Sequence, residues 1–124
     1  MREILFRGKR VCDNEWMYGD YEHFYLQDGE LIVYISDWGK GNEKVFPNTI
    51  GQYTGLTDKN GKKIFEGDIV NIDYYETTVI NAVIEWVGAG FVASTEYDDW
   101  ELDNFGFIEI VGNIHDNLEL LKGE

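Results

Sequence analysis

Cysteine and histidine are scarce in this 124-residue chain, and this limits the disulfides and metal sites that it can form. The one cysteine, Cys12, has no second cysteine with which to form a disulfide. His23 and His115 stand near opposite ends of the sequence, and with one cysteine they do not have the spacing of a zinc site. We therefore predict no metal and no cofactor.

Basic residues are absent between Ile64 and Leu121, a stretch that holds 13 acidic residues. The net charge of the whole chain is −14. Such a surface repels nucleic-acid backbones and anionic lipids. We therefore expect neither direct nucleic-acid binding nor membrane binding, and the simplest interpretation of the charge is a well-solvated surface.

Long apolar runs are also absent. No segment approaches the roughly 20 apolar residues that cross a bilayer, and the opening Arg2-Glu3 is unlike the start of a signal peptide. We expect a cytoplasmic protein.

Enzyme motifs are missing as well. The chain has no phosphate-binding loop, no zinc-protease motif and no nucleophile elbow. His115 stands next to Asp116, but the pair suits a polar tail better than a catalytic dyad. We predict that the protein is not an enzyme.

The chain is rich in residues that form strands. Hydrophobic residues make up 44% and aromatic residues 15%, while 14 glycines supply turns. Asp28-Gly29 and Asn60-Gly61 are strong hairpin signals. Residues 37–48 form a polar loop with Pro47 and divide an N-terminal β-hairpin region, residues 1–48, from a second half, residues 49–124.

The second half combines several short strands with tight turns, a pattern typical of a small closed or partly closed barrel. Residues 113–121 fit a short helical turn at the C-terminal end. Alternation in residues 69–87 and in the later strands predicts a buried face, whose members are Val70, Ile72, Ile80, Ile84, Trp86, Phe91, Ile108 and Ile110.

Three segments resemble the YopX-type proteins, which are carried mostly by bacteriophages and prophages. They are REILFRG at residues 2–8, GQYTGLTDKNGKKIFEGDIV at residues 51–70 and IEIVGNIHDNLELL at residues 108–121. The central segment is the specific one. The resemblance implies an SH3-like barrel in the C-terminal half and a location in a bacterial host cell, and it supplies no catalytic residues.

Two charged clusters are candidate sites. Lys59, Lys62 and Lys63 form a basic loop in an otherwise acidic half, which suits either a contact site or a solvated turn. The second cluster is acidic and lies in residues 96–103. It does not match a calcium-binding loop, because the required glycine and glutamate are missing. It suits either a solvated edge or an imitation of DNA phosphates, and consists of Glu96, Asp98, Asp99, Glu101 and Asp103.

Aromatic side chains crowd the N-terminal half. Trp16, Tyr18, Phe24 and Tyr25 cannot all be buried by a small hairpin, because successive residues of a strand point to opposite faces. Aromatic residues are enriched in interfaces, so we predict a homo-oligomer formed through this half.

These observations favour a non-enzymatic phage or prophage accessory protein that acts as a protein-interaction module. The sequence does not identify its partner. The alternative is an acidic DNA mimic that inhibits a nucleic-acid-binding protein of the host.

Overall fold

A computed structural model describes residues 4–37, 39, 41–74, 77–88, 90–97, 99–102 and 107–122. The chain is mainly β, as predicted, with antiparallel strands throughout the described residues. It divides into two compact units, Met1–Tyr53 and Thr54–Glu124. The division falls inside strand β5 (Gly51–Thr57) and not at the polar loop, because Gly51 and Gln52 are paired with the first strand of the chain.

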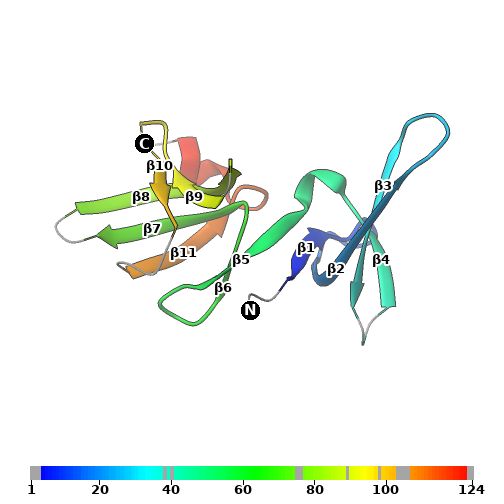
Figure 1. Ribbon diagram of the computed structural model, residues 1–124, viewed down its shortest axis with the longest axis horizontal. Helices are drawn as coiled ribbons and strands as arrows, with labels where there is room; N and C mark the ends of the chain where they lie inside the picture. The colour runs from blue at the N-terminus through cyan, green and yellow to red at the C-terminus, as the bar shows by residue number, and fades with distance from the viewer. Residues whose placement is uncertain are drawn as a thin grey trace. The chain divides into compact units, whose positions relative to one another are not determined.

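The first unit is an antiparallel arrangement of strands in the order β4-β3-β2-β1-β5. Strands β2 and β3 form a long hairpin (Figure 1), whose turn contains Gly29 at φ 91°. Glu30 donates its backbone N–H to Asp28 Oδ1 at 2.9 Å, so the predicted Asp28-Gly29 turn is confirmed. The elements are β1 (Phe6–Lys9), β2 (Trp16–Tyr25), β3 (Leu31–Asp37), β4 (Gly41–Val45) and the 3-10 turn η1 (Pro47–Thr49).

The second unit contains an antiparallel five-stranded sheet in the order β10-β9-β8-β7-β11, and β6 pairs beside β5. Figure 1 shows β7 between β8 and β11. The elements are β6 (Lys63–Phe65), β7 (Asp68–Tyr74), β8 (Thr77–Val87), β9 (Gly90–Ser94), β10 (Asp99–Glu101), β11 (Phe107–Asn113) and the 3-10 segment η2 (Leu118–Lys122).

This sheet is not closed into a barrel, so of the two predicted forms, closed and partly closed, the closed one is wrong. Closure requires the two edge strands to be hydrogen-bonded to each other. In the described residues, β10 pairs only with β9, and β11 pairs only with β7. Strand β10 has three residues, too few to continue the ladder round to β11.

The core of the second unit matches the predicted face in part. Val70, Ile72, Ile84, Phe91 and Ile108 are buried, and Ile110 packs against them half-buried. A separate core in the first unit consists of Met17, Val33, Ile35 and Val45.

Ile80 and Trp86 were predicted to be buried and are not: they are 63% and 48% exposed. The β7–β8 register shifts between Val70 and Ile72, which is a β-bulge. Because an extra residue reverses the alternation of a strand, Ile80 turns outward there. Trp86 lies near the end of β8 and contacts Phe91 edge-on at 4.8 Å between ring centroids, which leaves much of the indole exposed.

The predicted helical tail is the single 3-10 segment η2. Within the part of the chain that the structure describes, no helix has the length and apolarity needed to cross a membrane.

Candidate functional site

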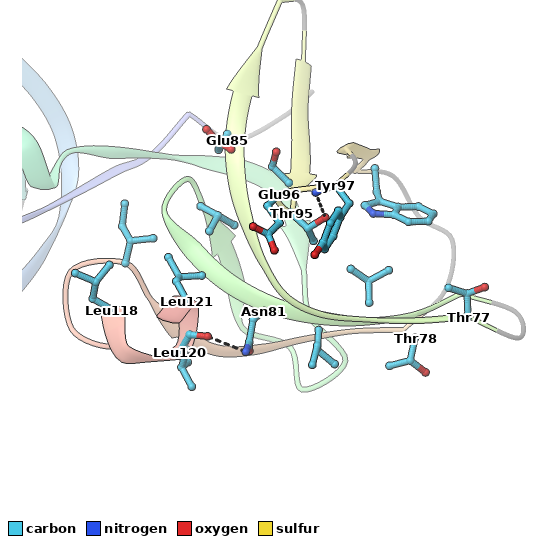
Figure 2. Close-up of a pocket in the computed structure, with 16 residues that line it drawn as sticks. Thr77, Thr78, Asn81, Glu85, Thr95, Glu96, Tyr97, Leu118, Leu120 and Leu121 are labelled. Carbon is cyan, nitrogen blue, oxygen red and sulfur yellow. Dashed lines mark hydrogen bonds between the residues drawn. The ribbon is translucent and has the colours of Figure 1, made fainter. Parts of the chain in front are cut away.

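A hollow with a volume of about 1060 Å³ lies on the second unit, and we call it the β8 hollow. Thr77–Asn81 from β8, Thr95–Tyr97 from the turn after β9, and Leu118, Leu120 and Leu121 from η2 contribute to its walls. Figure 2 shows the leucines of η2 at one end and Thr77 and Thr78 at the other.

The β-bulge of β8 builds this hollow. Asn81 adopts φ 54°, a left-handed conformation that asparagine tolerates better than most residues. Its backbone N–H donates to Asn71 Oδ1 at 2.9 Å, and its Nδ2 donates to the backbone oxygen of Leu120 at 2.9 Å (Figure 2). One residue therefore turns Ile80 toward solvent and also attaches η2 to the strand.

The lining is apolar with a polar rim. Ile80, Leu118 and Leu121 are 63%, 52% and 39% exposed, although they are large hydrophobic side chains. The charged lining residues are Glu85 and Glu96, and no basic side chain is among the described residues of the lining. Concave sites with apolar walls and few polar groups are typical of ligand and peptide binding.

Tyr97 lies on the rim with 89% of its surface exposed. A side-chain hydrogen bond to the Glu96 carboxylate, and the negative charge of that group, raise the pKa of Tyr97. The Tyr97 hydroxyl is thus an exposed hydrogen-bonding group beside the Glu96 carboxylate.

The lysine loop is a turn that is hydrogen-bonded to β11. Lys59 donates its backbone N–H to the oxygen of Ile108 at 2.8 Å, and its Nζ lies 3.6 Å from Glu109 Oε1. Lys62 is exposed on the same turn, and Lys63, the first residue of β6, is exposed beside it. The loop is thus built into the sheet, and its three ammonium groups remain at the surface.

The acidic cluster is only partly brought together. Asp98 and Asp103 lie outside the described residues. Asp99 and Glu101 are exposed on β10, and Asp99 accepts a hydrogen bond from the Ser94 hydroxyl. Glu96 belongs to the β8 hollow. Among the described residues, no group of three or more histidine, cysteine or acidic side chains could hold a metal ion.

The predicted oligomer contacts fall into two pairs. Trp16 and Tyr18 pair with β1, and the guanidinium of Arg7 lies 4.5 Å from the centroid of the Trp16 ring. Phe24 and Tyr25 end strand β2, and they are 46% and 66% exposed. Tyr18 is 43% exposed, whereas Trp16 is half-buried beneath Arg7.

Sequence reasoning missed the β8 hollow because it placed Ile80 in the core. An available signal was Asn81, a residue of low strand propensity that tolerates a left-handed backbone, inside an otherwise regular apolar alternation. Such a residue inside a strand is a marker for a bulge. Tyr97, Leu118 and Leu121 carried no comparable signal, since the chain fold alone brings them to β8.

The fold and the hollow define an all-β protein with two units, one of which carries an open sheet and a surface groove. The YopX protein family model matches residues 5–122, so the chain belongs to this family. The crystal structure of protein EF1440 from Enterococcus faecalis is similar, with a TM-score of 0.61, 24% sequence identity, and coverage of 98% of this chain and 99% of that chain. This likeness shows the fold. No protein with a curated description matches the chain.

Proposed function

We propose that the protein is a non-enzymatic interaction module that binds another protein through the β8 hollow. The observation that carries this proposal is the outward Ile80, a 63% exposed isoleucine held by a β-bulge next to the exposed leucines of η2. Exposed apolar side chains on a fixed strand, surrounded by a polar rim, are the usual composition of an interface.

The test compares two variants of one strand. Ile80→Asp places a charge in the hollow, whereas Val87→Asp places the same charge at a residue of β8 that is 50% exposed and does not line the hollow. We expect Ile80→Asp to lose a partner that wild type and Val87→Asp retain, measured by quantitative mass spectrometry of proteins captured from host cells. Equal retention by all three proteins would contradict the proposal. We expect both variants to fold, because exposed positions tolerate substitution.

The acidic DNA mimic is the second candidate, favoured by one observation. Asp99 and Glu101 are both exposed on β10, and alternate residues of a strand stand roughly 6.6 Å apart on one side, a spacing comparable to that of phosphates. Such a complex would dissociate in high salt and in the presence of competing DNA. Binding through the hollow would persist, because apolar burial is not screened by salt.

We also propose that the second unit is an open SH3-like barrel. Strands β7 to β10 form a meander and the last strand returns to the first, which gives the order β10-β9-β8-β7-β11. The YopX family resemblance further supports a phage or prophage accessory role in the cytoplasm of a bacterial host.

Self-association through the first unit is a further proposal, supported by the exposure of Tyr18, Phe24 and Tyr25. We expect light scattering at micromolar concentration and physiological salt to give a mass above the 14.4 kDa of one chain. The double variant Phe24→Ser/Tyr25→Ser should shift the mass toward one chain, because aromatic side chains anchor interfaces. Tyr97→Ser, at an exposed residue of the other unit, is the control. A mass of 14.4 kDa for wild type at every concentration would contradict self-association.

A further inference from the structure

The outer half of strand β2 has one edge that the described strands leave unpaired. Strand β1 pairs with β2 only along residues 16–19, and β3 pairs with the opposite edge along residues 20–25. The chain before β1 follows β5, because the backbone oxygen of Leu5 accepts a hydrogen bond from the N–H of Tyr53 at 2.8 Å. In the described part of the chain, the β1-side edge of residues 20–25 therefore has no strand beside it.

The backbone of this edge is oriented to pair with another strand. Leu26, just after β2, donates its N–H to the oxygen of Glu30 at 2.8 Å, so the backbone of Leu26 faces β3. Residues that face one neighbour in an antiparallel ladder alternate with residues that face the other side, and the register of β2 with β3 is regular. Tyr21, His23 and Tyr25 therefore direct their N–H and C=O groups toward the unpaired edge.

The side chains of the same three residues form a row of exposed rings. The rings of Tyr21 and His23 are stacked with centroids 5.3 Å apart, and Tyr25 meets His23 edge-on at 6.0 Å. Because successive side chains of a strand alternate between faces, the acidic Asp20 and Glu22 point to the other face. Aromatic rings at this edge suit aromatic rings on a strand placed beside it.

The segment is complementary to itself in one register. When two copies pair antiparallel about a two-fold axis at His23, Tyr21 lies opposite Tyr25 of the second copy, and Glu22 lies opposite Phe24 of the second copy. Aromatic pairs are among the favourable cross-strand pairs. The outward-facing residues also meet one another in this register, so they can exchange backbone hydrogen bonds.

Charge disfavours the neighbouring registers. Each chain has a net charge of −14, and like charges directly opposite each other destabilise a ladder. An axis at Glu22 would place the two Glu22 carboxylates opposite each other, and an axis at Tyr21 would place Asp20 opposite Glu22. An axis at Phe24 would pair only residues 23–25 of the two strands, because β2 ends at Tyr25.

We propose that two copies of the chain pair edge to edge through the outer half of β2, antiparallel and about a two-fold axis at His23. This proposal rests on the proposed self-association and gives it a surface and a register. Strand β4 pairs only with residues 33–37 of β3, so the loop end of the β2–β3 hairpin is two-stranded (Figure 1). Pairing makes this end four-stranded, which is stable where an isolated two-stranded hairpin is marginal.

Two substitutions of His23 separate backbone pairing from side-chain packing. His23→Pro removes the outward N–H, whereas His23→Thr keeps it and suits a strand. Proline is tolerated where the N–H of an edge strand faces solvent, so we expect both variants to fold, and denaturant unfolding checks this. Light scattering over a concentration series should show the Kd of dimerisation raised at least about tenfold by His23→Pro and less than about threefold by His23→Thr.

Crosslinking tests the register in a Cys12→Ser background, which lacks the exposed native thiol. His23→Cys places two thiols opposite each other, with Cα atoms about 5.5 Å apart, within the range of a disulfide. Phe24→Cys places them on a diagonal of roughly 7–8 Å, beyond that range. We expect oxidised glutathione to give a covalent dimer at least about tenfold faster with His23→Cys than with Phe24→Cys.

The outcomes distinguish this pairing from self-association in general. A wild-type mass of 14.4 kDa at every concentration would contradict both. A dimer that His23→Pro leaves intact, or that crosslinks equally fast through Phe24→Cys, would overturn the edge pairing and leave self-association standing. A dimer lost equally in His23→Pro and His23→Thr would show that the rings, and not the backbone, hold the copies together. If His23→Pro does not fold, the crosslinking rates decide.

Discussion

Replacing Asp58 by alanine is expected to lower the free energy of unfolding of the second unit by about 4 kcal/mol. The side chain is 6% exposed and its two carboxylate oxygens accept three backbone N–H groups. Oδ1 accepts from Asn60 at 2.9 Å and from Lys62 at 3.0 Å, and Oδ2 accepts from Ile110 at 3.1 Å. Alanine would leave these donors without acceptors, and each costs about 1–3 kcal/mol when it is buried.

The control is Asp28→Ala, at the other aspartate–glycine hairpin turn. Asp28 is exposed, and its carboxylate accepts a hydrogen bond from Glu30. We expect a loss of about 1 kcal/mol or less, because water replaces the lost acceptor. Chemical denaturation of both variants measures the difference. Equal losses for Asp58→Ala and Asp28→Ala would mean that the lysine loop is held to β11 by other contacts.

The same carboxylate gives the stability a dependence on pH. Burial raises the pKa of Asp58. The backbone N–H groups of Ile110, Lys62 and Asn60, together with the charge of Lys62, lower it by a larger amount, so the pKa lies below its usual value. A group with a depressed folded-state pKa contributes stability that is fully present above its unfolded pKa of about 4. The difference between wild type and Asp58→Asn should therefore shrink as the pH falls below about 4.

Local turn chemistry was the part of the fold that could be predicted from the sequence. Gly61 follows Asn60 at φ 83°, and Asp58 accepts the hydrogen bonds expected of a turn aspartate. Such turns depend on neighbouring residues only. Alternation also placed Val70, Ile72 and Phe91 correctly on the buried face, although it did not predict that Ile69 is buried as well.

Barrel closure and the candidate site could not be predicted in the same way. Closure depends on whether the last strands are long enough to meet. No local sequence pattern specifies that length, and β10 is only three residues long. The β8 hollow depends on one inserted residue at Asn81 and on η2, which lies 39 positions further along the chain. Non-local contacts of this kind are invisible to periodicity.

Gly19→Ala is the second change with a large expected effect. The pairing of β2 with β1 is regular around Gly19, which lies opposite Phe6. A Cβ atom on Gly19 would nevertheless lie 2.1 Å from the backbone oxygen of Ser36 in β3. No rotamer change relieves this contact, since the neighbour is main chain, so the hairpin would have to shift. We expect a loss of about 3 kcal/mol in the first unit, the upper part of the usual range for overpacking.

Gly90→Ala is the matched control for this prediction. Gly90 also lies in a strand, its φ is not in the left-handed region, and nothing stands within 4 Å of the added Cβ. Alanine there should be neutral or stabilising by about 0.4–1 kcal/mol, because it restricts the unfolded chain. Denaturant unfolding followed by amide exchange would assign each effect to its own unit. A Gly19→Ala protein as stable as Gly90→Ala would show that β2 and β3 separate freely at this point. The long β2–β3 hairpin would then be a loosely held element, and Phe24 and Tyr25 at its far end would be poorly placed to anchor a second copy of the chain.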